Sequence, residues 1–177
     1  MASFRRLPPA LLLFDGTCAL CNHSARFVLK CTQRLSRDVL CVAELQNDAV
    51  VKAVKAQAGV DLTRFRDCQT IVLLQCQPGR EAVNQVTVPA SPDLNAVDDV
   101  SVSVSTKSAA VFKTAMLCDW RAGRWLARLA YAVVPTLVGD AVYDFVGRYR
   151  IAWFGRVNDA GVCVRPPPEF RARIWRP

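Results

Sequence analysis

Two cysteines separated by two residues, Cys18 and Cys21, carry the clearest chemistry in this sequence. They follow the apolar run Ala10–Phe14 and the pair Asp15-Gly16, and the residues after them repeat with helical spacing. A thiol in the first turn of a helix lies beside unpaired backbone N–H groups and the positive end of the helix dipole, and both stabilise its thiolate. Because the thiolate is the nucleophile of disulfide exchange, this placement predicts a redox-active dithiol.

The position of each residue around this turn predicts its role. Cys18 is expected to attack a substrate disulfide, and Cys21, one helical turn later, to resolve the mixed disulfide. Asp15 is either a proton acceptor for the thiols or a carboxylate that hydrogen-bonds to N–H groups of the turn. Asn22 is expected on a face of the helix away from the core. His23, the one histidine of the chain, is expected on the helix surface, with a role in tuning the dithiol as the alternative.

Two other interpretations of the cysteine pair remain open: structural thiols on an inert scaffold, and half of a zinc site. A structural zinc site takes four ligands, but the sequence has no second CxxC. The isolated cysteines also lack ligand-like spacing: Cys31, Cys41, Cys68, Cys76 and Cys118. We therefore expect no metal and no cofactor.

Composition favours a reducing intracellular compartment. The chain has 177 residues and eight irregularly spaced cysteines, unlike a small secreted disulfide scaffold. The apolar run that precedes the dithiol is too short for a signal core or a membrane span. We expect a location in the cytosol or an organelle, and the arginine-bearing, acid-free first fourteen residues make the mitochondrion a candidate.

The elements around the dithiol follow an α/β pattern. Apolar runs predict strands at Ala10–Phe14, Val39–Ala43 and Thr70–Leu74. Helical spacing begins at Cys18, with Thr17 as the expected N-cap, and a second helix covers Asp48–Ala58 and ends at Gly59. This alternation of strands and helices implies parallel crossovers.

The following segment adds an edge strand and a helix to this unit, and a short strand at Val86–Val88 is a further candidate. Residues 77–99 contain several prolines and are interpreted as a long loop or insertion. Alternating valine and serine over Val100–Ser105 predict an edge strand with one apolar face. A helix is predicted over Ser108–Leu117. The order βαβ then ββα, with a mixed sheet, is that of the thioredoxin fold.

The chain from Asp119 onward is predicted to be helical and rich in arginine and aromatic residues. We divide the molecule into a core of residues 1–118 and an α-helical extension of residues 119–177 that packs on it. Apolar residues with helical periodicity are predicted to face the core: Trp125, Leu126, Leu129 and Val133. A further helix covers Ala141–Arg150, and the prolines at 166–168 are expected to end the ordered part.

The formal net charge of +8 is concentrated toward the two ends of the chain. Such ends could attract an acidic or phosphate-rich partner, although solvated arginine-rich helices are the simpler and favoured explanation. No basic stretch is interleaved with aromatic residues on a strand, so nucleic-acid binding is not expected.

The residues around the dithiol also carry a family resemblance. The segment from Asp15 to Asn22 resembles the D-G-x-C-x-x-C-N signature of the DCC family of thiol-disulfide oxidoreductase-like proteins. Further blocks of the chain are similar to this family: Val104–Ala110, Asp140–Val146, Arg148–Arg150, Trp153–Gly155, and Cys163 with Pro166. The resemblance covers roughly residues 10–168. Thioredoxins place a cis-proline before the third strand, where this chain has Gln69-Thr70 and the family also lacks the proline.

The resemblance implies a thioredoxin-like fold and a dithiol oxidoreductase that acts through a mixed disulfide. Its partners are expected to be protein or small-molecule disulfides and dithiols, with an external thiol reductant to regenerate it. One alternative is a non-catalytic binding module that uses a basic C-terminal surface. Another is a metal-binding or redox-sensing protein without turnover.

Cys163 is a candidate third thiol. It follows Gly155 in an arginine-rich turn and could fold back toward the dithiol, where nearby arginines would favour thiolates. These arginines are Arg148, Arg150 and Arg156. In the competing interpretation the aromatic residues of this segment are packing anchors, covered by the aliphatic stems of the arginines: Tyr143, Trp153 and Phe154.

Overall fold

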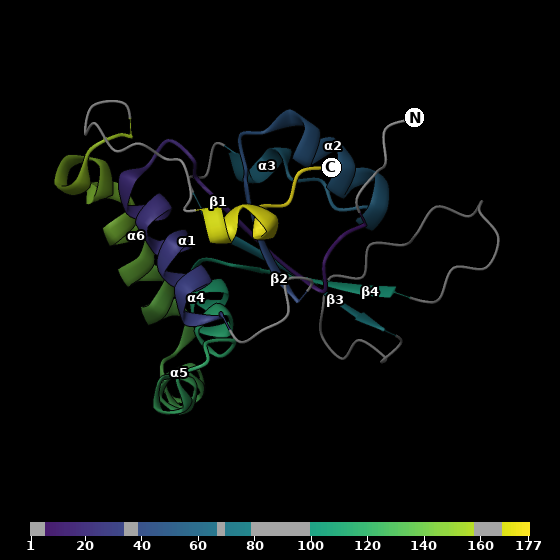
Figure 1. Cartoon of the computed structure of the whole chain (residues 1–177). Coiled ribbons are helices and arrows are strands. Elements are labelled where there is room, and N and C mark those ends of the chain that lie inside the picture. Colours follow the sequence, from purple (N-terminus) through teal and green to yellow (C-terminus); the bar gives the residue numbers. More distant parts are fainter. Residues whose placement is uncertain (1–5, 34–38, 67–69, 79–99, 158–167) are drawn as a thin grey trace.

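A computed structural model describes residues 6–33, 39–66, 70–78, 100–157 and 168–177, and Figure 1 shows a sheet with helices packed around it. The strands are β1 (Ala10–Phe14), β2 (Leu40–Glu44), β3 (Val72–Pro78) and β4 (Val100–Thr106). The α-helices are α1 (Ala19–Cys31), α2 (Asp48–Ala58), α3 (Thr63–Arg66), α4 (Lys107–Ala115), α5 (Arg121–Val133) and α6 (Thr136–Phe154). A 3-10 helix, η1 (Pro168–Arg173), follows near the C-terminus.

The described strands form a mixed four-stranded sheet in the order β2-β1-β3-β4. Strand β1 pairs in parallel with β2 and antiparallel with β3, and β3 pairs antiparallel with β4. This arrangement confirms the mixed α/β sheet and the βαβ–ββα order expected of a thioredoxin-like fold. The expectation of parallel crossovers throughout was wrong, because β3 runs opposite to β1.

The short helix α3 explains this reversal. Its residue Arg66 donates hydrogen bonds to the carbonyl oxygens of Leu45 at 3.2 Å and Gln46 at 2.6 Å, which directly follow β2. The chain after α2 has therefore returned to the end of the sheet where β2 finishes. From there β3 can only run back antiparallel to β1 and β2.

Strand β1 is buried on both faces and divides the interior into two clusters. Leu11 and Leu13 belong to the cluster formed with α2, whereas Leu12 and Phe14 belong to the cluster formed with α1 and α4. A strand covered on both faces is a continuous apolar run instead of an alternating one. The run Ala10–Phe14 was therefore predicted with its observed bounds.

Strand β4 lies at the edge of the sheet, as its alternating pattern predicted. Its serine face is nevertheless not solvated, because Ser103 and Ser105 are buried. Lys113 of α4 donates a hydrogen bond to the Ser105 hydroxyl at 2.8 Å. Because these hydroxyl side chains are small, α4 can pack over the serine face of β4, which the sequence alone predicts to be exposed to solvent.

The C-terminal segment is ordered beyond the prolines at 166–168, contrary to the sequence expectation. Phe170 and Trp175 are buried in the two clusters, and the Trp175 amide donates to the carbonyl oxygen of Val42 at 2.9 Å. This segment therefore covers the outer edge of β2, a position where an exposed strand would invite pairing with another chain.

Buried Arg173 fixes this segment to the end of α1. Its guanidinium donates hydrogen bonds to three backbone carbonyl oxygens, those of Leu29, Thr32 and Leu40. A cation at the C-terminus of a helix satisfies carbonyl groups that have no partner within the helix.

The division at residue 118 stays a prediction, and residues 79–99 of the predicted insertion lie outside the described residues.

The outer helices differ most from expectation. The apolar residues of α5 that were predicted to face the core are exposed: Trp125, Leu126, Leu129 and Val133. Helix α5 instead buries the small residue Ala127. Helix α6 is longer than the predicted Ala141–Arg150, and its Gly139 lies close to Ser108 of α4. Small residues allow close helix contacts, so the large apolar side chains are left outside.

Candidate active site

The dithiol lies where β1 ends and α1 begins, as the sequence predicted. The N-cap of α1 is Cys18, with φ −90° and ψ 125°, one residue later than the expected Thr17. Cys21 therefore lies within the first turn of the helix. Backbone hydrogen bonds from Cys21 and Leu20 to the Cys18 thiol, together with the helix dipole, favour negative charge at Cys18.

The two thiols differ strongly in acidity. A hydrogen bond from the Cys21 thiol is the main cause that lowers the pKa of Cys18 to about 6, against the opposing effect of burial. The same hydrogen bond, followed by burial, raises the pKa of Cys21. At neutral pH Cys18 is therefore the thiolate and Cys21 keeps its proton.

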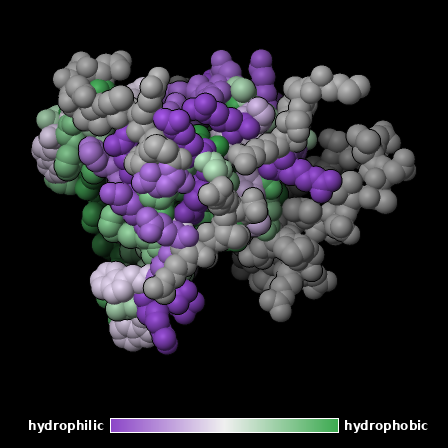
Figure 2. Space-filling view, viewed as in Figure 1, coloured by the Kyte–Doolittle hydropathy of each residue, from purple (hydrophilic) through white to green (hydrophobic). Residues whose placement is uncertain are grey.

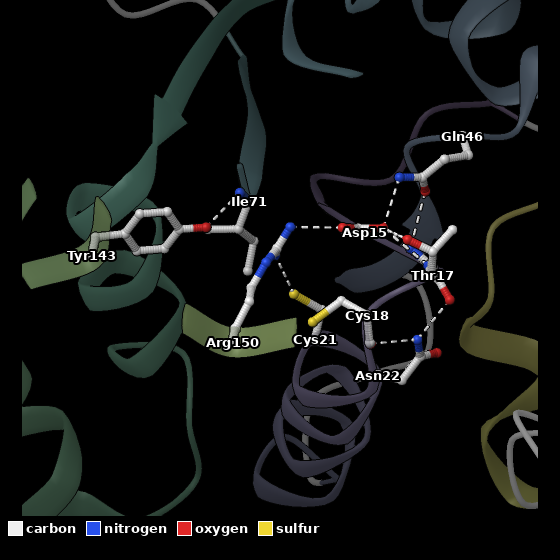
Figure 3. Close-up of polar contacts among 10 residues, drawn as sticks. Asp15, Thr17, Cys18, Cys21, Asn22, Gln46, Ile71, Tyr143 and Arg150 are labelled. Carbon is white, nitrogen blue, oxygen red and sulfur yellow. Dashed lines mark hydrogen bonds and ion pairs between the residues drawn. The ribbon is translucent and has the colours of Figure 1, made fainter. Parts of the chain in front are cut away.

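Arg150 of α6 connects the dithiol to Asp15. Its side chain is 3% exposed, and its two terminal nitrogens donate to Cys21 Sγ at 2.9 Å and to Asp15 Oδ2 at 2.7 Å (Figure 3). Burial disfavours the guanidinium charge, but the neighbouring thiols and carboxylate outweigh it and raise the pKa of Arg150. A positive charge is therefore held in direct contact with the Cys21 thiol.

Asp15 uses both carboxylate oxygens to hold the turn and the arginine. Its Oδ1 accepts hydrogen bonds from the Thr17 amide at 3.0 Å, the Thr17 hydroxyl at 2.7 Å and the Gln46 side chain at 2.9 Å (Figure 3). Its Oδ2 pairs with Arg150. Asp15 thus makes the hydrogen bonds to the turn that the sequence offered as one alternative, and its role as a proton acceptor stays a prediction.

Asn22 was expected to face away from the core but is buried. Its amide nitrogen donates to the carbonyl oxygens of Gly16 at 2.8 Å and Cys18 at 2.9 Å. Buried carbonyl groups require donors, and this side chain supplies one to each side of the turn. The neighbouring His23 is exposed on α1, as predicted.

A backbone segment, residues 155–157, lies across Cys18. The described hydrogen bonds that hold it run from Val157 N to Thr17 O, 3.1 Å, and from Ala19 N to Gly155 O, 3.4 Å. Arg156 and Cys18 form an isolated antiparallel bridge between them. The Cys18 side chain is 0% exposed, while Cys21 is partly exposed. Cys18 is therefore the less accessible of the two thiols.

Tyr143 positions the start of β3 beside the dithiol. Its hydroxyl accepts a hydrogen bond from the Ile71 amide at 2.8 Å, and burial is the main cause that raises the pKa of Tyr143 (Figure 3). The sequence interpretation as a packing anchor thus missed a polar role for this residue. Trp153 and Phe154, the other expected anchors, are exposed.

The six described cysteines are all free thiols. Cys31 and Cys118 are hydrogen-bonded to each other, and burial, followed by Cys31, raises the pKa of Cys118 to about 11. Cys163 and Cys68 lie outside the described residues, so the third-thiol role of Cys163 stays a prediction. Within the described part of the chain, no group of three or more His, Cys, Asp or Glu residues could hold a metal ion.

Sequence reasoning found the dithiol and Asp15, and it named Arg150 among the arginines that would favour thiolates, but it missed the supporting roles of Asn22, Tyr143 and Gln46. Asn22 directly follows the dithiol in the resembling signature, and Tyr143 lies in the resembling C-terminal block, which is the signal that could have found their roles. Gln46 carries no comparable signal, because it reaches Asp15 only through the pairing of β1 with β2.

Comparison with known proteins agrees with this geometry. The model of the DCC1-like thiol-disulfide oxidoreductase family matches residues 12–156, which include the dithiol and Arg150. A curated protein of Bacillus subtilis (strain 168), described as uncharacterized protein YuxK, is 26% identical over 169 residues, 96% of each chain. No solved structure matches the chain significantly.

Proposed function

Because the chain belongs to the DCC1-like thiol-disulfide oxidoreductase family, we propose that it reduces or isomerises disulfides through the Cys18–Cys21 dithiol. The observation that carries this proposal is the asymmetry of the pair. Cys18, with a pKa of about 6, is a thiolate at neutral pH, whereas Cys21 remains protonated. Exchange needs one nucleophile at a time, and this pair supplies it.

In the first step the Cys18 thiolate attacks one sulfur of a substrate disulfide. A new S–S bond joins Cys18 to that sulfur, the substrate S–S bond breaks, and the second substrate sulfur leaves as a thiolate. The Cys21 proton, already shared with Cys18, is the nearest source for protonating the leaving thiolate.

In the second step Cys21, now deprotonated, attacks Cys18 in the mixed disulfide. The Cys18–Cys21 disulfide forms and the first substrate sulfur leaves, so that two electrons have passed from the dithiol to the substrate disulfide. Arg150 donates to Cys21 Sγ and therefore stabilises the thiolate that this step requires. Asp15 acts as a positioning residue in this scheme, because it fixes the guanidinium that faces the thiol.

Turnover requires a second dithiol or thiol that returns two electrons to the Cys18–Cys21 disulfide. We propose glutathione or a thioredoxin-like dithiol as this reductant and an intracellular reducing compartment, cytosol or organelle, as the location. Substrates of this scheme are protein or small-molecule disulfides, and no organic cofactor takes part.

The proposal is tested by equilibrating the protein with glutathione redox buffers and counting free thiols. We expect a reversible two-electron couple between about −270 and −120 mV, the range of known thiol oxidoreductases. Cys18→Ser and Cys21→Ser should each abolish it. Cys21→Ser should also accumulate a mixed disulfide with glutathione at Cys18. The control is Cys76→Ser, which removes a thiol outside the site and should leave the couple unchanged.

A pH titration of thiolate absorbance in the Cys21-intact protein checks the asymmetry separately. Because the pKa of Cys18 is lowered, its thiolate should form as the pH rises through about 6. Cys18→Ser should remove that transition. A first thiolate transition near the ordinary value of 9.0, together with no reversible disulfide, would identify the pair as structural and refute the proposal.

A further inference from the structure

The outer faces of α5 and α6 form an exposed apolar surface. We call it the outer apolar face. Its largest exposed side chains lie along the two helices: Trp125 65%, Leu126 59%, Leu137 85%, Phe145 56% and Trp153 57%. In Figure 2, green and pale atoms follow the left edge of the molecule, where Figure 1 places α6 and, below it, α5. Large apolar side chains that are exposed together in this way are typical of a docking site.

The aromatic residues of α6 form a connected cluster on this face. Phe145, Tyr149 and Trp153 recur at four-residue intervals along one side of the helix, and the rings of Tyr149 and Trp153 stack with centroids 5.5 Å apart. Phe145 contacts both of them. Tryptophan and tyrosine are the residues enriched where protein meets the interface of a lipid bilayer.

The border of the outer apolar face is basic. Arg121, Arg124 and Arg128 follow one another at spacings of three and four along α5, so they lie on one side of the helix next to the apolar residues. Helix α5 contains no acidic residue. None of the three arginines forms an ion pair with a residue that the structure describes. In Figure 2, purple atoms border the pale surface of this region.

We propose that the outer apolar face binds the surface of an anionic lipid bilayer, with the aromatic and aliphatic side chains at the headgroup level and the arginines on lipid phosphates. An amphipathic helix with tryptophan and leucine on one side and arginine on the other is typical of such interfacial binding. Helices α5 and α6 both pack against α4, and α6 also packs against α1, whereas the residues of the outer apolar face are exposed.

A second copy of the chain fits this face less well. In a two-fold dimer the same surface patch meets itself, so the three arginines of each copy would approach those of the other with no acidic side chain on α5 to balance them. An anionic bilayer supplies the missing negative charge. Complementarity of charge therefore favours lipid over self-association.

The helices lie on the bilayer in this proposal and do not cross it. No single helix in the described ranges is long and apolar enough to span a membrane, and only α5 and α6 taken together reach that length and composition. The two helices are bent by 112° relative to each other. The three arginines spread along α5 also belong at the headgroups and not in the hydrocarbon layer.

The test is co-sedimentation of the full chain with phosphatidylcholine vesicles that contain or lack phosphatidylglycerol. We expect binding to the anionic vesicles, together with a blue shift of tryptophan fluorescence, because three of the four tryptophans are exposed and lie in α5, in α6 or at the N-cap of α5: Trp120, Trp125 and Trp153. Binding to neutral vesicles should be much weaker.

Two variants remove the two components of the surface. Arg121→Gln/Arg124→Gln/Arg128→Gln should weaken binding to anionic vesicles about a hundredfold, since each arginine near such a surface contributes about fivefold. Leu126→Gln/Phe145→Gln should abolish the blue shift. The matched control, Lys30→Gln/Lys52→Gln/Arg171→Gln, removes three exposed charges elsewhere and should bind as the unchanged protein does.

No binding to anionic vesicles, or an equal loss in the matched control, would overturn the proposal. A stable dimer in sedimentation velocity that Leu126→Gln/Phe145→Gln dissociates, without vesicle binding, would assign the face to a second copy instead. Exchange of the dithiol with glutathione, measured on the same variants, should be unchanged. The membrane proposal and the proposed redox function can therefore fail independently.

Discussion

The inner and outer faces of α6 reverse the usual arrangement of a helix at a protein surface. The inner face directs Tyr143 and Arg150 toward β3 and the dithiol, whereas the outer face exposes Phe145 and Trp153. Helices at a protein surface normally bury their apolar stripe and expose their charges. The proposed redox function depends on the inner face, and the proposed membrane contact depends on the outer face.

The largest expected effect comes from removing the charge on the inner face. Arg150→Met leaves the Asp15 carboxylate buried without its cation, which should lower the free energy of unfolding by about 3–5 kcal/mol. It should also raise the pKa of Cys18, because a positive charge near the thiolate is lost. Urea denaturation and thiolate absorbance measure the two effects.

A double variant separates charge from packing at this position. Asp15→Asn/Arg150→Met removes both charges, so its free energy of unfolding should exceed that of Arg150→Met alone. If Arg150→Met proves as stable as the unchanged protein, the inner face does not depend on the ion pair and the contrast between the two faces loses its basis.

The next largest effect is expected from a change in residues 155–157, which are bridged to Cys18 through the backbone. Gly155 has φ 75° and ψ 176°, a conformation that only glycine adopts readily. Gly155→Ala should cost about 1–3 kcal/mol and loosen residues 155–157, so that Cys18 reacts faster with a small disulfide reagent. The matched control is Gly147→Ala, because a methyl group there meets nothing within 4 Å. Equal rates in the two variants would mean that this segment does not limit access.

A smaller effect is expected from the tyrosine of the inner face. Tyr143→Phe removes the acceptor of the Ile71 amide and should lower the free energy of unfolding by about 1 kcal/mol. Tyr131→Phe, which changes an exposed tyrosine of α5, should have no measurable effect. Denaturant unfolding of both variants decides whether the inner hydroxyl contributes more than the outer one.

The smallest effect on stability is expected on the outer face. Phe145→Gln should change the free energy of unfolding by less than about 0.5 kcal/mol, because an exposed side chain contributes little to the core. For comparison, Leu12→Ala in the buried central strand should cost about 2–5 kcal/mol. A large loss in Phe145→Gln would show that another part of the protein covers this face in solution.

The sequence by itself determined those strands and helices whose local residue pattern is compatible with only one type of element. Strand β1 and helix α2 were predicted with their observed bounds, because a short apolar run between turn residues and an amphipathic run that ends at Gly59 are local signals. The dithiol was placed at the start of α1 for the same reason. Its chemistry follows from residue type and from the end of the helix on which it lies.

Only the tertiary structure decided which side of each outer element is covered. Periodicity predicted that α5 is amphipathic. Its large apolar residues are nevertheless exposed, because α5 packs on α4 through small residues such as Ala127. The ion pair of Arg150 with Asp15 joins residues that are 135 positions apart, and no local pattern encodes that contact. Spacing along a chain fixes the faces of an element, whereas packing between elements selects the face that meets the solvent, the core or the thiols.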